Sequence, residues 1–307
     1  SLTFFYLFKP KLYIITRHDI WPLHIIAAKL FKTKIAYINA NIYYQSKRLN
    51  FLFINMNKII YNLIDYISVP NIQIKNIFLN ELGFRNHIKV IEDTRYERIN
   101  DKKNNNIINK NNSFKKKYVI VLGSIDNTDF QYFQKYFNSL ANNQKNNFRK
   151  FFQLIIAPHE INDYIISKIV KFLKCNHIGY DKYSKNKLSN NKEAIIIDTI
   201  GDLKDLYFLA DITYIGGGLK GGVHSVFEPA IYNSIISYGS NYQLLHDAVN
   251  MKKNEISYVI KNHNDFYFIN DLLDSEIKIQ SKKNEMKKFI SNYSTTSSKE
   301  VISFLRL

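Results

Sequence analysis

The chain of 307 residues carries 43 Lys and Arg against 26 Asp and Glu, a formal net charge of +17, and 46% of its residues are hydrophobic. This length and apolar content allow a large core and leave room for two domains. The charge favours anionic partners such as an anionic membrane surface or a phosphorylated substrate, although a solvated basic surface without a specific partner accounts for it equally well. No zinc-finger or RNP-type motif accompanies the charge, so we expect no nucleic acid partner.

The single cysteine and the short apolar runs narrow the class of protein further. Because Cys175 is the only cysteine, an internal disulfide is excluded and a reducing compartment is favoured. No apolar run reaches the roughly 18–20 residues that a membrane span requires. The opening SLTFFYLF lacks the basic start and the small-residue cleavage site of a signal peptide. Since the first residue is Ser1 and not Met, we expect sequence upstream of it.

The first hundred residues alternate apolar runs with helical patterns. Helices are predicted at 21–31 and 71–83, and Gly83 suits the C-cap of the second. Strands are predicted at 11–16, 34–40, 65–70 and 87–92. Strands that alternate with helices in this way indicate parallel βαβ units.

The second half repeats this pattern after a polar segment, residues 100–117, which reads as a linker. Strands are predicted at 118–124, 152–158, 194–199, 212–218, 234–239 and 256–260, and a mostly helical tail at 271–307. We therefore predict an α/β fold of two doubly wound domains, 1–100 and 117–307, joined by a linker at 101–116. The C-terminal helices could pack back on the first domain. Ligands of such sheets bind at the carboxyl ends of the strands.

Half of the ten glycines fall in one turn, GGGLKGGVHSVFEP at 216–229. The turn follows a predicted strand and precedes a predicted helix, so its backbone amides could bind a phosphate. It is not a Walker A loop, because the Lys-Ser/Thr ending is missing, and its spacing does not fit G-x-G-x-x-G. Two structural interpretations stay open. The segment could be a flexible loop, and Ser225 and Glu228 could form a capping box of the helix.

Three other strand ends carry polar side chains or a glycine at the same predicted edge. They are His159 in IAPHEIND, Asp19 in TRHDIWP and Gly201 in DTIGD. Each has an ordinary structural interpretation as well: a surface histidine, Asp19 as the N-cap of the next helix, and a crossover helix with Thr199 as its N-cap. The second histidine of a zinc-binding HExxH motif is missing after His159, and we expect no metal and no cofactor.

The order of these motifs resembles the bacterial 3-deoxy-D-manno-octulosonic acid (Kdo) transferases. Residues 201–249, from GDLKDLYFLADITYIGGG to NYQLLHDAV, are similar to the family's donor-binding half, with its GEL-like start, LADVAFVGGS and GGHN-x-x-EPA. IAPHEI, EDTRYERI, and TRHDIWP followed by KIAYINANI match further family segments. The GGG and GGVHSVFEPA version is closest to the family's Bacteroidetes-like branch.

The resemblance implies a GT-B glycosyltransferase with two Rossmann-like domains whose parallel sheets face a cleft, the N-terminal domain being incomplete. The C-terminal domain would bind the donor CMP-Kdo and the N-terminal domain a lipid A precursor. The enzyme would attach Kdo to that precursor in lipopolysaccharide core synthesis, at the cytoplasmic face of the inner membrane. Peripheral binding to that anionic surface agrees with the net charge of +17.

The resemblance also implies roles for individual residues. Glu228 falls on the acidic residue that commonly holds ribose hydroxyls in GT-B folds. Asp19 takes the place of the second catalytic carboxylate and Arg95 that of a basic residue at the domain hinge, while the family's general base would precede Ser1. The donor-binding positions are Ser124, Pro158, His159, Gly201, Gly216, Gly217, Gly218, Lys220, Gly221, Gly222, His224, Ser225 and Glu228.

Departures from the family pattern keep other functions open. Ser225 replaces the Asn that follows the loop histidine, and only Gly123 and Ser124 remain of the family's G-S-T stretch. We interpret the chain as a fragment or the product of a truncated gene, because the donor loop survives. One alternative is another GT-B enzyme or an epimerase of that fold that acts on a different nucleotide sugar. Another is a non-catalytic basic protein that docks on anionic lipid or RNA.

Overall fold

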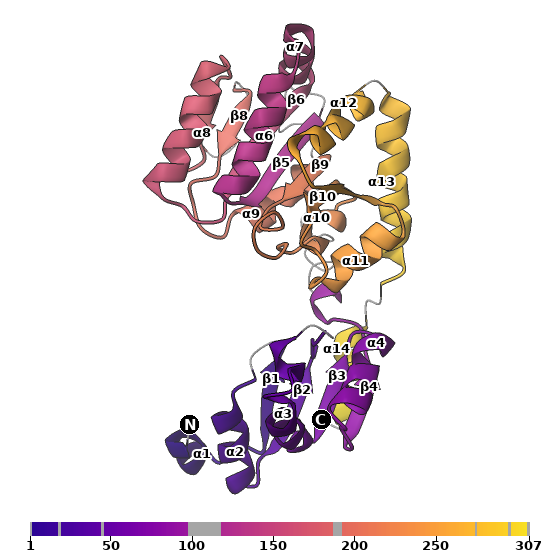
Figure 1. Ribbon diagram of the computed structural model, residues 1–307. Helices are drawn as coiled ribbons and strands as arrows, with labels where there is room; N and C mark the ends of the chain where they lie inside the picture. Colours follow the sequence, from indigo (N-terminus) through magenta and orange to yellow (C-terminus); the bar gives the residue numbers. More distant parts are fainter. Residues whose placement is uncertain are drawn as a thin grey trace. The chain divides into compact units, whose positions relative to one another are not determined.

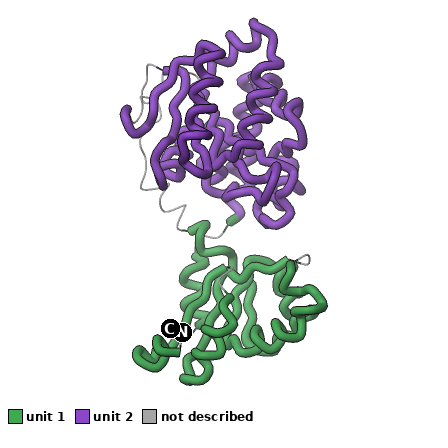
Figure 2. Tube along the Cα trace, turned by 60° about the vertical axis from the view of Figure 1, so that its left-hand side comes forward, with its two compact units in different colours: residues 1–100, 293–307 green, residues 101–292 purple. Residues whose placement is uncertain are grey.

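The computed structural model describes residues 2–17, 20–43, 46–97, 118–186, 192–273, 275–293 and 296–305. The chain divides into two compact units, one of residues 1–100 with 293–307 and one of residues 101–292 (Figure 2). The predicted linker at 101–116 lies outside the described residues. The last helix, α14 (Ser297–Leu305), belongs to the first unit. The second domain was predicted to extend to residue 307, whereas the second unit ends at residue 292.

The first unit is built on a parallel sheet of four strands in the order β1-β2-β3-β4 (Figure 1). The strands are β1 (Leu12–Thr16), β2 (Lys34–Ile38), β3 (Tyr66–Val69) and β4 (His87–Val90). The helices are α1 (Leu2–Phe8), α2 (Pro22–Leu30), α3 (Ile54–Asn62), α4 (Ile72–Asn76) and α14, with short turns η1 (Lys47–Leu49) and η2 (Ile77–Glu81). The four strands predicted from the apolar runs are all present.

Helices cover both faces of this sheet because its side chains alternate between them. Ile35 and Tyr37 of β2 lie in a buried cluster with residues of α1 to α4. Ala36, between them, lies in a separate cluster with Val301 and Leu305 of α14. Helix α14 therefore completes the core of a sheet formed by the first hundred residues.

The second unit contains a parallel sheet of seven strands in the order β11-β10-β9-β5-β6-β8-β7. The strands are β5 (Tyr118–Ile125), β6 (Phe152–Pro158), β7 (Tyr180–Lys182), β8 (Ala194–Ile196), β9 (Ile212–Ile215), β10 (Ile235–Gly239) and β11 (Ser257–Ile260). The helices are α6 (Asn127–Ser139), α7 (Asn142–Phe151), α8 (Asp163–Cys175), α9 (Leu203–Leu206), α10 (Phe227–Ala230), α11 (His246–Lys253), α12 (Phe268–Leu273) and α13 (Glu276–Ser291), with turns η4 (Tyr207–Leu209) and η5 (His263–Tyr267).

The strand order of the second unit reverses between β5 and β9. From β5 the chain proceeds outward to β6 and onward, whereas from β9 it proceeds the other way to β10 and β11. Adjacent strands at such a point send their following segments to opposite faces, which leaves a crevice at their carboxyl ends where ligands bind. The topology therefore directs the search for a site to the segments that follow β5 and β9.

Two predicted helix starts are wrong, for local reasons. A helix capped by Ser225 would need an N–H at position 229 to bond the Ser225 carbonyl, and Pro229 has none. The helix α10 starts instead after Val226, and the N–H of Ala230 donates to the Val226 carbonyl. Thr199 caps no helix either, because Gly201 has a φ of +91° that breaks any helix there, and α9 starts after Asp202.

The first unit gives a similar correction and one agreement. The N-cap of α2 is Trp21 with Pro22 in the first turn, so the reading of Asp19 as the N-cap is wrong. The predicted helix at 71–83 consists of α4 and η2 and ends at the C-cap Leu82. Gly83 follows with a φ of +59°, the left-handed conformation expected after a helix end. No helix in the described ranges is both long and apolar enough to cross a membrane.

Candidate functional site

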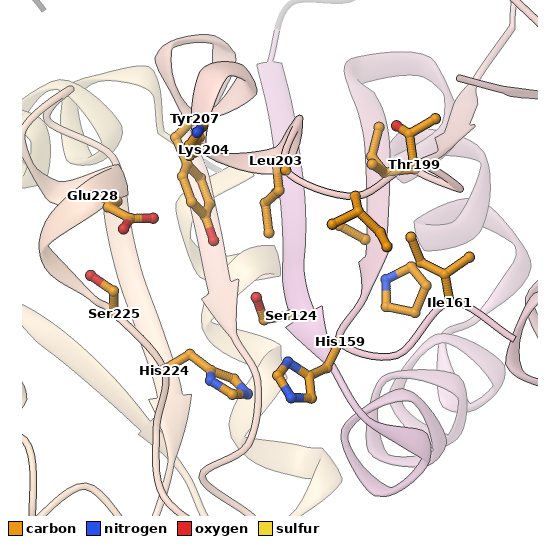
Figure 3. Close-up of a pocket in the computed structure, with 15 residues that line it drawn as sticks. Ser124, His159, Ile161, Thr199, Leu203, Lys204, Tyr207, His224, Ser225 and Glu228 are labelled. Atoms are coloured by element: carbon orange, nitrogen blue, oxygen red, sulfur yellow. The ribbon is translucent and has the colours of Figure 1, made fainter. Parts of the chain in front are cut away.

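A cavity of about 380 Å³ opens in the second unit at the carboxyl ends of its central strands (Figure 3). Ser124 reaches it from β5, and Pro158 and His159 from the end of β6. The segments after β8 and β9 supply most of the remaining lining, so the cavity occupies the crevice that the strand order predicts. The lining residues are Ser124, Ala157, Pro158, His159, Ile161, Ile197, Thr199, Ile200, Gly201, Leu203, Lys204, Tyr207, His224, Ser225 and Glu228.

The structure brings together about half of the donor-binding positions that the sequence indicated. Those in the lining are Ser124, Pro158, His159, Gly201, His224, Ser225 and Glu228. The glycines at 216–218, 221 and 222 and the exposed Lys220 are outside the lining. Asp19 lies outside the described residues. Arg95 lies in the first unit, where its guanidinium pairs with Asp93 at 2.6 Å.

The first three loop glycines pack against the protein's own backbone. A Cβ on Gly216 would lie 2.3 Å from the Ser124 carbonyl oxygen, and one on Gly218 would lie 3.0 Å from the Cα of Gly239. Gly217 has a φ of +90°, which other residues rarely adopt. The N–H of Gly216 donates to the Gly123 carbonyl at 2.9 Å. These glycines therefore let the segment after β9 lie close to the end of β5.

Asp129, in the first turn of α6, holds the glycine turn in place through hydrogen bonds. Its carboxylate accepts hydrogen bonds from the Tyr214 hydroxyl at 2.6 Å and from the Gly217 N–H at 2.8 Å. It also accepts one from the Asp126 N–H at 2.9 Å, which completes a capping box of α6. Burial raises the pKa of Asp129 to about 6 in spite of these donors. Sequence analysis did not identify this residue, although the DNTD at 126–129 carries the capping signal.

Ser124 stands at the end of β5 in an uncommon conformation. Its φ is +52°, in the left-handed region, and the pairing register of β5 with β6 shifts between Gly123 and Ile125. Such residues cost of order 1–3 kcal/mol and gather at functional sites. The distortion lies one residue before the end of β5, and Ser124 forms part of the cavity wall.

Two histidines stack at the cavity. The rings of His159 and His224 have centroids 4.3 Å apart and an interplanar angle of 27° (Figure 3). Burial and the neighbouring His159 lower the pKa of His224, while Asp126 raises it. Sequence analysis named both residues singly but could not show that they meet.

Three polar or aromatic lining residues were missed or misassigned. Lys204 and Tyr207 come from α9 and η4, and both were part of a plain helical pattern in the sequence. The Tyr207 side chain is buried, and burial and Glu228 raise the pKa of its hydroxyl. This hydroxyl lies against Gly123 and leaves no room there for a Cβ. The Thr199 hydroxyl is buried in the wall without a hydrogen-bond partner. A buried donor without a partner suits a ligand contact.

The arrangement offers complementary chemistry for a nucleotide. Imidazole, ammonium and hydroxyl groups can donate to phosphate oxygens, and the Glu228 carboxylate can accept from sugar hydroxyls. Within the residues that the structure covers, no group of three or more His, Cys, Asp and Glu side chains could hold a metal ion.

One family model matches the first part of the chain. The model, described as 3-deoxy-D-manno-octulosonic-acid transferase (kdotransferase), matches residues 2–98. The 3-deoxy-D-manno-octulosonic acid transferase of Rickettsia prowazekii is 27% identical over 158 residues, which are 50% of this chain and 34% of that protein. The chain spans 20–40% of the length of the curated relatives that it matches.

Solved structures share the fold at low sequence identity. The C-terminal CMP-Kdo binding domain of WaaA from Acinetobacter baumannii has a TM-score of 0.50 and 14% identity, covering 66% of this chain and 100% of that chain. A putative UDP-N-acetylglucosamine 2-epimerase from Listeria monocytogenes has a TM-score of 0.67 and 10% identity, covering 99% and 76%. The predicted GT-B-type fold with two parallel-sheet α/β domains is confirmed.

Proposed function

Because the chain is a sequence relative of the Kdo transferases, we propose that it is a glycosyltransferase that moves Kdo from CMP-Kdo to a lipid A precursor. The observation that carries the proposal is the cavity beside the β5–β9 reversal, which gathers Ser124, His159, His224 and Glu228. The structural likeness to a CMP-Kdo binding domain, which covers 66% of this chain, supports the proposal. Because the chain spans only part of the length of its relatives, we propose the complete transfer reaction for the whole protein to which this chain belongs.

In this proposal the cavity binds the cytidylate of the donor. Negative charge develops on the phosphate as CMP departs, so cationic and hydroxyl donors placed there stabilise the transition state. Lys204, Ser124 and the two histidines supply such donors. Glu228 lies beside Ser225 at one side of the cavity, suited to accept hydrogen bonds from ribose hydroxyls (Figure 3).

Calorimetry with CMP tests the donor site directly. Glu228→Gln should weaken CMP binding roughly 10- to 150-fold, since a hydrogen bond to a charged group contributes about 1.5–3 kcal/mol. Glu160→Gln is the matched control, because Glu160 is exposed and lies outside the cavity lining. No heat of binding at millimolar CMP, or equal affinity of both variants, would refute the proposed site.

Another nucleotide-sugar enzyme of the same fold is the second candidate. It is favoured by the higher TM-score of 0.67 to the putative epimerase, against 0.50 to the CMP-Kdo binding domain. Competition among CMP, UDP and GDP for the cavity separates the two candidates. The Kdo transferase proposal requires CMP to bind at least tenfold more tightly than UDP, and the reverse preference would favour the epimerase-like function.

For the acceptor we propose that the first unit docks on an anionic membrane surface. Helix α1 exposes Leu7 and Phe8 at 66% and 70%, and the exposed Lys9 and Lys11 follow directly. Apolar side chains next to lysines complement an anionic lipid surface, since each basic residue near it contributes about 1 kcal/mol. The net charge of +17 adds a long-range attraction.

Vesicle co-sedimentation tests this surface. Leu7→Glu with Phe8→Glu should abolish binding to phosphatidylglycerol-containing vesicles, whereas Ile277→Glu, at a residue of the second unit that is 81% exposed, should not. Unchanged sedimentation of the double variant would contradict the proposal. Loss of self-association in that variant, without any vesicle binding by the wild type, would instead assign the surface to a protein contact. Vesicle binding without any nucleotide binding would favour the non-catalytic alternative.

A further inference from the structure

Backbone hydrogen bonds position the two stacked histidines, His159 and His224. The N–H of His159 donates to the Ile125 carbonyl at 2.9 Å, and the N–H of His224 donates to the Gly216 carbonyl at 3.2 Å. A Cβ on Gly217 would lie 3.1 Å from both Cδ2 and Nε2 of His224, so the ring lies directly against this glycine. The ring pair is thus fixed by the ends of β5 and β9, the two strands at which the sheet order reverses.

Few negatively charged groups near the two histidines are available to balance a positive charge on both rings. Asp126, at the N-cap of α6, is the carboxylate that favours protonation of His224. Its side chain already accepts hydrogen bonds from the N–H groups of Thr128 and Asp129. Asp129 is committed to the Tyr214 hydroxyl and to the Gly217 and Asp126 N–H groups.

The other charged groups belong to the same cavity or border it. Lys204 and Glu228 line the cavity with the pair, and Glu160 follows His159 in the chain. Burial and the proximity of His159 both lower the pKa of His224. Two imidazolium rings with centroids 4.3 Å apart would repel each other in the absence of an anion.

We propose that the His159–His224 pair is the phosphate subsite of the cavity and that it takes up a proton from solvent when a ligand's phosphate binds. The inference rests on the proposed nucleotide site and adds its binding chemistry. An anionic phosphate beside the rings offsets their mutual repulsion, so the second imidazole nitrogen becomes protonated and donates a charge-assisted hydrogen bond to a phosphate oxygen. No covalent bond changes, and the proton comes from water or buffer.

Proton uptake makes affinity depend on pH. By linkage, each proton taken up on binding makes the association constant fall about tenfold for every unit by which the pH rises. The slope should appear above the range in which the free pair is already protonated. A nucleoside without a phosphate should show no such slope, because it brings no charge to the rings.

Calorimetry in buffers of different ionisation enthalpy measures the protons taken up. The probe is cytidine 5′-methyl phosphate, whose phosphodiester does not titrate in the range used, with cytidine as the ligand that lacks the phosphate. We expect the wild type to take up roughly 0.5–1 proton per diester bound at pH 7 and its affinity to fall roughly three- to tenfold between pH 7 and 8. His159→Asn with His224→Asn should bind more weakly, with no proton uptake and a flat pH profile.

His177→Asn is the matched control. His177 is exposed in the same unit with a φ of +54°, which Asn adopts readily, so this variant should retain the wild-type proton uptake. Diester binding without proton uptake, or equal uptake in the double variant, would overturn the inference and leave the proposed function standing. Absence of binding by both the diester and CMP at millimolar concentration would overturn the nucleotide site and the inference together.

Discussion

Replacing Gly216 by alanine should disrupt the site through the backbone. The new Cβ would lie 2.3 Å from the Ser124 carbonyl oxygen, 2.6 Å from the Ile125 Cα and 2.7 Å from Asp129 Oδ2. The first two are backbone atoms that no rotamer change can move. The segment after β9 must therefore shift away from the end of β5, where Ser124 lies.

The cost follows from the contacts that this shift disturbs. Overpacking a close-packed site costs typically 1–3 kcal/mol. The hydrogen bonds from the Gly216 N–H to Gly123 and from the Gly217 N–H to Asp129 would weaken, each contributing about 1 kcal/mol. We expect a loss of about 3 kcal/mol in the free energy of unfolding. For a domain of about 150–250 residues this lowers Tm by roughly 6–12 °C.

Gly222→Ala is the control for this prediction. A Cβ there meets nothing within 4 Å, and its φ is not in the left-handed region, so Tm should change by no more than about 2 °C. Circular dichroism gives both midpoints, and calorimetry with CMP should show at least tenfold weaker binding for Gly216→Ala alone. Equal midpoints for the two variants would refute the claim that close backbone packing requires this glycine.

Three further changes test other parts of the second unit. The pKa of Asp129 is raised to about 6 from about 3.9 in an unfolded chain, so the folded state binds this proton more tightly. The free energy of unfolding should therefore fall by up to about 3 kcal/mol as the pH rises from 4 to 6. Asp129→Asn should lack this slope in urea titrations, and an unchanged slope would contradict the assignment. Thr199→Val should leave stability unchanged or raise it by about 1 kcal/mol, because the buried hydroxyl has no partner, and a loss above about 1 kcal/mol in urea titration would contradict this reading. Asp211→Ala should cost about 3–5 kcal/mol in the same assay, because it leaves the Lys283 ammonium and the Val119 N–H without their buried carboxylate, and a cost below 1 kcal/mol would show that the ion pair is dispensable.

The sheets could be predicted from the sequence because most of their strands are buried on both faces. Runs such as FQLIIAP at 152–158 are continuous apolar segments, and β6 has those bounds with every residue buried. The edge strand β7 (Tyr180–Lys182) was missed, since its three residues YDK are only partly buried and carry no apolar run. Strand order and the reversal at β5 and β9 are set by tertiary pairing, which no local pattern records.

The site was only partly predictable for a related reason. His159 and Glu228 could be found because they stand at strand ends or in a family motif, and topology then brings them to one edge. The role of the glycines could not be read from spacing, because a turn that packs against Ser124 and a turn that approaches a phosphate need the same residue. The orphaned hydroxyl of Thr199 depends on its surroundings, which appear only in the folded structure.

The contribution of α14 to the first unit has a consequence for biosynthesis. Val301 and Leu305 cover the face of the sheet that includes Ala36, so that layer cannot close until the end of the described chain has left the ribosome. At about 5–20 residues per second, translation of the intervening second unit imposes a delay of roughly 10–40 s. A nascent chain arrested before residue 297 should therefore yield a protease-resistant second unit while its first hundred residues are digested.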